Sequence, residues 1–177
     1  MMSRLLPLLA FIALAVLLFA GVRMNSGKDN SAIPSPLIGK PAPEFSLPVL
    51  NQENKIIHTN DLKGHPYLLN VWGSWCPACQ IEHPVITRLA ESGKIRVIGY
   101  NYKDETEAAN KWLQQFGNPY DLILSDQPGR AALDWGIYGA PETFLVDAKG
   151  IVRWKNVGPI TPEIIEQQIL PALETPQ

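Results

Sequence analysis

The sequence predicts an α/β fold with a central mixed β-sheet flanked by helices, preceded by an N-terminal transmembrane helix. Three observations lead to this prediction. The chain opens with one long apolar segment, short β-rich segments then alternate with helical patterns, and two strands at hairpin spacing stand near the end. Alternating strands and helices favour parallel pairing, and a hairpin adds antiparallel strands to the same sheet.

Residues 1–24 are interpreted as a membrane anchor, with a cleaved secretory signal as the alternative. After Arg4, residues 5–22 are apolar and interrupted only by Pro7 and Gly21. This length is close to the lower limit for a membrane-spanning helix, which needs about 17–25 residues. The apolar part of a signal peptide is usually shorter, about 7–15 residues, and the small-residue cleavage site here is weak. A retained anchor is therefore favoured.

Residues 25–37 are predicted to form a flexible linker, because they are small and polar and then contain two prolines. Residues 38–177 form the soluble domain, which is long enough to bury a core without disulfides.

The formal net charge is −2 and no long basic run is present. This argues against a nucleic-acid-binding protein, which needs a basic patch to displace counterions from phosphates.

The domain contains a series of expected strands and helices. We predict a buried strand at 67–72 (YLLNVW), a helix from about 76 to 92, a strand at 95–100, a helix at 105–116, a strand at 122–124, a short helix at 129–135, and strands at 143–147 and 151–156. The last two strands are joined by three residues, which is hairpin spacing. A final helix is predicted to start at Thr161, a good N-cap, followed by Pro162 at the favoured first position.

The two cysteines, Cys76 and Cys79, are the strongest indication of chemistry. They are the only cysteines of the chain and are separated by two residues. A structural disulfide stabilises more when it closes a long loop, so a bridge across so short a loop would constrain almost nothing. A CxxC that follows a buried strand and opens a helix is instead typical of a redox-active pair.

The position of the pair predicts the role of each sulfur. Free N–H groups and the helix dipole stabilise an anion at a helix N-terminus, so Cys76 is expected to be the nucleophilic thiolate. Cys79, one turn further and more buried, would resolve the mixed disulfide. Pro77 supplies a helical φ where a missing N–H costs little. Trp75 is interpreted either as a core aromatic or as part of a substrate platform beside the thiolate.

Other uses of the cysteines fit the sequence less well. Covalent haem attachment needs CxxCH, but Gln80 follows the second cysteine. A structural zinc ion needs four ligands; His83 is near, whereas His58 and His65 lie in distant segments. We expect no metal and no cofactor beyond the redox-active disulfide, and we expect His83 to lie at the surface or on a helix face.

Several motifs together resemble one known family. They are GKPAPEF at 39–45, YLLNVWGSWCPAC at 67–79, Pro84, and GAPETF at 139–144. These segments resemble thioredoxin-fold proteins and, more closely, the membrane-anchored DsbE/CcmG thiol:disulfide interchange proteins of bacterial cytochrome c biogenesis. The resemblance covers essentially the whole chain and implies a thioredoxin-like fold for residues 38–177.

The resemblance also implies roles for residues outside the CxxC. Pro141 would be cis and face the cysteines, and Ala140 would offer backbone hydrogen bonds to a bound peptide. Pro84 would kink the active-site helix. Glu82 and Glu142 would be the acidic residues near the cysteines, which disfavour the thiolate and relay protons. The alternative is a solvated Glu82 on the helix face and a Glu142 that caps a loop.

One position departs from thioredoxin, which buries a carboxylate in the strand before the CxxC where this chain has Asn70. An amide cannot accept a proton at physiological pH. If Cys79 needs a base, Glu82, Glu142 or water must serve.

The function implied by the resemblance is reduction of disulfides in apocytochrome c, or in a dedicated thiol partner serving it, with electrons from a membrane thiol transporter. The domain would be a monomer on the periplasmic side of the bacterial inner membrane, held by a single-pass anchor. A CxxC alone does not set the direction, because related pairs span about −270 to −120 mV. The alternatives are a general periplasmic thiol reductase or oxidase, and a haem or metal chaperone.

Overall fold

The computed structural model describes residues 2–25 and 35–174, with side chains for residues 10–21 and 35–173. The chain divides into two compact units, residues 1–33 and residues 34–177. In the first unit, α1 (Met2–Asn25) is a single helix whose side chains at 10–21 are exposed. Among the described residues, no helix combines the length and apolarity needed to span a membrane. The predicted linker falls mostly on residues 26–34, which lie outside the described residues.

The second unit contains one mixed β-sheet. Within its described residues the strands are β1 (Ser46–Val49), β2 (Gln52–His58), β3 (Tyr67–Trp72), β4 (Arg96–Tyr102), β5 (Leu122–Asp126), β6 (Glu142–Val146) and β7 (Val152–Val157). They lie in the order β2-β1-β5-β4-β3-β6-β7. The central strands β3, β4 and β5 are parallel, whereas the remaining pairs are antiparallel. The predicted mixed sheet and the β6–β7 hairpin are confirmed.

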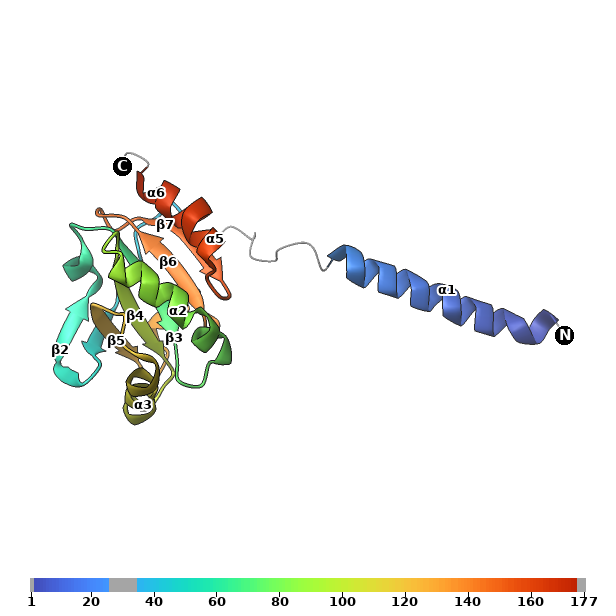
Figure 1. The fold of residues 1–177 in the computed structure, drawn as a ribbon, viewed down its shortest axis with the longest axis horizontal. Helices are drawn as coiled ribbons and strands as arrows, with labels where there is room; N and C mark the ends of the chain where they lie inside the picture. The colour runs from blue at the N-terminus through green and yellow to red at the C-terminus, as the bar shows by residue number, and fades with distance from the viewer. Residues whose placement is uncertain (1, 26–34, 175–177) are drawn as a thin grey trace. The chain divides into compact units, whose positions relative to one another are not determined.

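Helices cover both faces of this sheet. They are η2 (Thr59–Leu62), α2 (Pro77–Glu91), α3 (Thr106–Phe116), α4 (Ala131–Asp134), and a C-terminal series of α5 (Pro162–Ile164), η3 (Ile165–Ile169) and α6 (Leu170–Glu174). In Figure 1, α2 crosses one face of the central strands. Thr161 caps α5 and Pro162 takes its first position, as predicted. The segment η3 is a π-helix, and Pro171, which has no N–H to donate, follows it.

The β1–β2 hairpin and η2 were not predicted. Strand β1 contains Pro48, and proline in a run argues against a strand. Strand β2 is almost entirely exposed and polar at its start, so it lacks the apolar pattern that marks a buried strand. Strand β2 is the edge strand, where a polar sequence is tolerated, whereas β1 lies between β2 and β5. Pro48 lies next to a register shift in β1, and β1 pairs with β5 at Val49, so a missing N–H at Pro48 is tolerated there.

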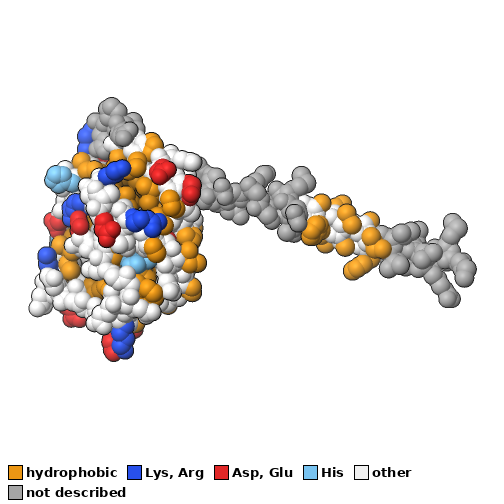
Figure 2. Space-filling view, in the orientation of Figure 1, with side chains coloured by type: hydrophobic (Ala, Val, Ile, Leu, Met, Phe, Trp, Pro, Cys, Tyr) orange, Lys and Arg blue, Asp and Glu red, His pale blue; other side chains and the backbone are white. Residues whose placement is uncertain are grey.

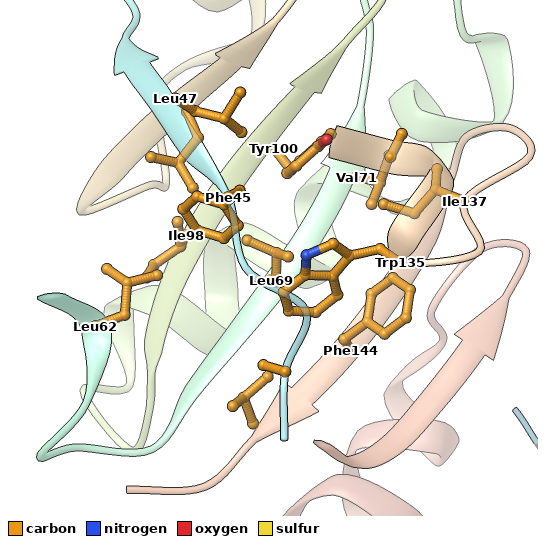
Figure 3. Close-up of a cluster of buried hydrophobic side chains, with 14 of the residues drawn as sticks. Phe45, Leu47, Leu62, Leu69, Val71, Ile98, Tyr100, Trp135, Ile137 and Phe144 are labelled. Atoms are coloured by element: carbon orange, nitrogen blue, oxygen red, sulfur yellow. The ribbon is translucent and has the colours of Figure 1, made fainter. Parts of the chain in front are cut away.

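Alternate residues of β3 point to opposite faces and build two apolar clusters. One contains Leu69, Val71, Trp135 and Phe144, with the Trp135 ring packed edge-on against Phe144 at 5.1 Å between centroids. Figure 3 shows this cluster. The other lies under α2 and α3 and contains Leu68, Trp72 and both cysteines. The candidate site therefore belongs to the α2 side of the sheet.

Candidate active site

The cysteines lie where the central strand β3 passes into α2. Cys76 is the N-cap of α2, so the helix begins at Pro77, one residue later than predicted, with proline in its first turn. Cys76 and Cys79 form a disulfide with 5.3 Å between their Cα atoms. The backbone N–H of Cys79 donates to Cys76 Sγ at 3.1 Å. A free helix N–H thus meets the sulfur, as anion stabilisation at Cys76 requires.

Both cysteines are almost completely buried. The exposed fraction is 3% for Cys76 and 2% for Cys79, so the predicted difference in exposure is not present in the disulfide form. The disulfide lies in the apolar cluster that contains Trp72, and Ala78 and Ala140 pack against this cluster. A partner sulfur must therefore approach through the surface formed by the neighbouring loops.

The loop before Cys76 is clamped by Asp104, which follows β4 and is 5% exposed. Its carboxylate accepts four hydrogen bonds, from Ser74 N at 2.7 Å, Ser74 Oγ at 2.6 Å, Asn101 Nδ2 at 2.9 Å and Glu105 N at 3.0 Å. This residue was not predicted. A signal for it exists in the sequence, since the strand–helix–strand pattern around it is typical of parallel strands whose carboxyl ends share an edge, where sites form.

Trp75 lies at the surface beside the disulfide. The residue is 48% exposed. Its Nε1–H donates to the Tyr102 carbonyl at 3.1 Å, and its ring packs edge-on against the Tyr102 ring. The interpretation as a core aromatic is therefore wrong. A role as substrate platform stays a prediction, which this exposure and fixed orientation favour.

The loop before β6 also reaches the disulfide cluster. The Ala140–Pro141 peptide bond is cis, as the resemblance implied. Ala140 packs against the cluster that contains both cysteines. Pro84 lies inside α2, which continues through it to Glu91. Peptide binding by the backbone of Ala140 stays a prediction.

Glu82 is a residue of α2 and lies on the buried face of this helix, as Cys79 does. It is 2% exposed, so its interpretation as a solvated residue is wrong. Asn70 Nδ2 donates to Oε1 and the Ile160 N–H donates to Oε2, both at 2.8 Å. Burial raises the pKa of Glu82 to about 7, against these two hydrogen bonds, which lower it. The carboxyl can therefore change its charge near neutral pH.

Glu142, equally buried at 2% exposed, has different partners. Its Oε2 pairs with Lys155 Nζ at 2.8 Å, and its Oε1 accepts the N–H groups of Tyr138 and Gly139 at 3.0 and 3.3 Å. It caps the loop that leads to Pro141, in agreement with the loop-capping alternative. The ion pair indicates a structural role.

His83 is buried in the α2–α3 interface, 4% exposed, and not at the surface. Its Nε2 lies 3.1 Å from the Phe116 carbonyl and its ring meets Trp112 edge-on at 4.5 Å. Burial lowers its pKa, with the Phe116 contact opposing the shift. Within the described ranges, no group of three or more His, Cys, Asp or Glu residues is arranged to hold a metal ion.

Comparison with known proteins places the site in a family. The Redoxin family model matches residues 37–170. A thiol:disulfide interchange protein DsbE from Xylella fastidiosa (strain 9a5c) is 51% identical over 162 residues, covering 92% of this chain and 81% of the relative. The DsbE protein of Escherichia coli K12 is 45% identical over 96% of this chain and 92% of the relative. The chain belongs to the DsbE family of thiol:disulfide interchange proteins.

A solved DsbE structure from Chlorobium tepidum shares the fold of this chain. It has a TM-score of 0.66 and 31% identity, and the match covers 77% of this chain and 97% of that structure. The thioredoxin-like α/β fold of this DsbE family member is thereby confirmed. With a disulfide between Cys76 and Cys79 in its CxxC motif, the protein is a thiol–disulfide oxidoreductase.

Proposed function

We propose that this protein reduces disulfides during cytochrome c maturation on the periplasmic side of the bacterial inner membrane. Its substrate would be apocytochrome c, or a dedicated thiol protein that serves it. The observation that carries the proposal is the Cys76–Cys79 disulfide at the N-terminus of α2, with a helix N–H on Cys76 Sγ. The motifs shared with the cytochrome c biogenesis proteins support the choice of substrate.

In the proposed reaction, the Cys76 thiolate attacks one sulfur of the substrate disulfide. The new bond forms as the substrate S–S bond breaks, and the second substrate sulfur leaves as a thiolate that takes a proton from water. The N–H of Cys79 stabilises the attacking thiolate. Trp75 and the backbone of Ala140 would hold the substrate peptide beside the sulfur.

Cys79 completes the cycle. Its thiol gives a proton to Glu82 and attacks Cys76 Sγ, which re-forms the internal disulfide and releases the second substrate thiolate. Two electrons have then passed from the dithiol to the substrate. Glu82 suits this role because it lies one turn after Cys79 on the buried face of α2 and has a pKa of about 7. A membrane thiol transporter would return the oxidised pair to the dithiol.

The trapping experiment for the substrate uses Cys79→Ala in the full-length protein. Without the resolving thiol, substrates should stay attached to Cys76 and be identified by mass spectrometry after non-reducing purification. The Cys76→Ala/Cys79→Ala variant is the matched control and should trap nothing. We expect apocytochrome c or one dedicated thiol protein; a broad set of unrelated exported proteins would indicate a general thiol reductase instead.

The direction of transfer is tested by equilibrium with glutathione. A reductant should stay largely in the disulfide form except at high ratios of reduced to oxidised glutathione. An equilibrium that strongly favours the dithiol would overturn the reductant role.

The membrane anchor is part of the same proposal. Within α1, described side chains such as Phe11, Leu17 and Val16 are apolar and more than half exposed, and Figure 2 shows this part of the helix as hydrophobic. The protein should stay in the membrane fraction after alkaline extraction, as a monomer, with its N-terminus intact. Recovery in the soluble fraction with the N-terminal segment removed would favour the cleaved signal.

A further inference from the structure

The single amide in the otherwise apolar strand β3 belongs to Asn70, which is 1% exposed. Burying an amide is unfavourable unless its donors and acceptor are satisfied. Both hydrogens of Asn70 Nδ2 are used, to Glu82 Oε1 at 2.8 Å and Thr143 Oγ1 at 3.0 Å. Its Oδ1 accepts the Tyr120 hydroxyl at 2.9 Å. Every partner of this amide comes from a different segment of the chain.

Tyr120 determines which way the amide faces. Burial raises the pKa of Tyr120 well above its ordinary value, and the nearby Glu82 charge raises it further, so its hydroxyl stays protonated and donates. Asn70 must therefore turn Oδ1 toward Tyr120, which leaves Nδ2 to donate to Glu82. The Tyr120 ring stacks on Trp72 with 5.7 Å between centroids.

Gly99 makes room for this arrangement. It pairs with Asn70 across the β3–β4 ladder, and a Cβ at this position would lie 2.9 Å from Cγ of Tyr120. Such a contact is too close for a side chain other than hydrogen. The absence of a side chain at Gly99 thus lets the Tyr120 ring lie close enough to reach Asn70.

We propose that Asn70 and Tyr120 are positioning residues that hold the Glu82 carboxyl in one orientation for proton exchange with Cys79. The inference rests on the proposed role of Glu82. Asn70 and Ile160 each donate to one carboxyl oxygen, and neither group can take or supply a proton at physiological pH. The hydrogen-bond partners of Glu82 therefore hold the carboxyl without exchanging protons with it, and the proposed proton donor is Cys79, one turn earlier on the buried face of the same helix.

Few other groups that could change charge face this carboxyl. Tyr120 precedes β5, Cys79 is on α2 with Glu82 itself, and Cys76 caps that helix. His83 turns to the Phe116 carbonyl, and Glu142 pairs with Lys155. Among the residues that the structure describes, Glu82 forms no ion pair with Lys or Arg. The neutral amide of Asn70 is thus the main side-chain partner of Glu82.

An aspartate at position 70 would have nearly the same shape but a very different effect. Two carboxyl groups would then meet where the amide and Glu82 now lie 2.8 Å apart, and both could not ionise together. Glu82 would lose its proton only at higher pH. Replacing the Tyr120 hydroxyl instead frees the amide to rotate without adding charge.

The test separates the attack of Cys79 on the mixed disulfide from the earlier attack of Cys76. The reduced full-length protein is mixed with the aromatic disulfide DTNB in a stopped-flow instrument over a range of pH. Attack by Cys76 releases the first nitrothiobenzoate, and attack by Cys79 on the mixed disulfide releases the second. We expect Asn70→Asp to move the inflection of the second phase upward by about one pH unit or more. Tyr120→Phe should slow that phase by about three- to tenfold.

Tyr100→Phe is the matched control. Like Tyr120, Tyr100 is a buried tyrosine whose hydroxyl donates to a buried side-chain oxygen; its acceptor is the Asp126 carboxylate instead of an amide, and Tyr100 belongs to the cluster on the other face of the sheet. This variant should leave the pH profile of the second phase unchanged, whatever its stability. If Asn70→Asp does not fold, the contrast of Tyr120→Phe with Tyr100→Phe decides.

The outcomes separate this inference from the proposed function. If Glu82→Gln keeps the wild-type pH profile, Glu82 is not the proton acceptor and the proposed step itself fails. If Glu82→Gln loses the inflection while Asn70→Asp and Tyr120→Phe match the wild type, the positioning role alone is overturned.

Discussion

Glu82 and Glu142 are the same side chain, each 2% exposed, yet they have different surroundings. Glu82 meets an amide and one backbone N–H, whereas Glu142 meets the ammonium group of Lys155 and two backbone N–H groups. Burial disfavours a charge unless an opposite charge or enough donors offset it. The comparison shows that two equally buried carboxyl groups can differ in their partners, and that, within the described residues, only Glu142 has an opposite charge beside it; this difference is the basis for the proposed chemical role of Glu82.

The largest expected effect comes from breaking the ion pair. Glu142→Gln leaves Lys155, whose side chain is only 10% exposed, without its counter-charge. We expect a loss of about 4 kcal/mol in the free energy of unfolding. Urea denaturation followed by tryptophan fluorescence measures it. The double variant Glu142→Gln/Lys155→Met should recover more than half of the loss, and a single-variant loss below about 1 kcal/mol would contradict the structural role.

The second effect is a pH dependence specific to Glu82. Its pKa is raised from 4.5 to about 7 on folding, so the folded state binds the proton more tightly than the unfolded state. Its contribution to stability is therefore present below about pH 4.5 and is lost as pH rises to about 7, by about 3 kcal/mol in all. The difference between the wild-type and Glu82→Gln stability curves should show this slope. The Glu142→Gln variant, although less stable, should keep the same pH-dependent slope, because its Glu82 is unchanged.

A third buried carboxylate sharpens the comparison, since Asp104 accepts from four donors and, in the described part of the chain, has no cation partner. Asp104→Asn replaces one accepting oxygen with an NH₂ group that faces those donors. We expect a loss of about 2 kcal/mol in the free energy of unfolding and a slower first release of nitrothiobenzoate from DTNB, because the loop before Cys76 is no longer clamped. An unchanged first phase would show that Asp104 stabilises the fold without positioning Cys76.

The smallest effect on stability is expected at the exposed Trp75. Trp75→Ala removes one hydrogen bond and one edge-on contact with Tyr102, which together contribute about 1 kcal/mol. If Trp75 is a substrate platform, KM for a peptide disulfide should rise severalfold while the DTNB reaction, which needs no peptide contact, changes little. Trp75→Phe should restore part of the peptide binding. Equal changes for both substrates would argue against the platform.

The sequence predicted elements whose evidence is local. The apolar run of β3, the hairpin spacing of β6 and β7, and the Thr161-Pro162 start of α5 all appear where expected. The unpredicted hairpin shows the limit of that approach. The polar start of β2 is accepted because β2 is the edge strand, and Pro48 is accepted because it lies next to a register shift in β1; no local pattern reveals either.

Burial was the property that local patterns judged least well. His83 was expected at the surface or on a helix face and lies against Trp112, and Asp104 was not singled out although it holds the active-site loop. Both depend on α3 or on the end of β4 meeting α2 and its loop. The contact exists only once the sheet has brought these segments together.

By itself, the sequence determined the CxxC pair and its place between a buried strand and a helix, because spacing and helix-capping preferences act over a few residues. Only the tertiary structure decided that Glu82 is removed from water and held by Asn70 and by the N–H of Ile160, 78 positions further along the chain. The proton affinity of a carboxyl depends on the whole of its surroundings, and these surroundings are assembled from segments that sequence neighbours do not specify.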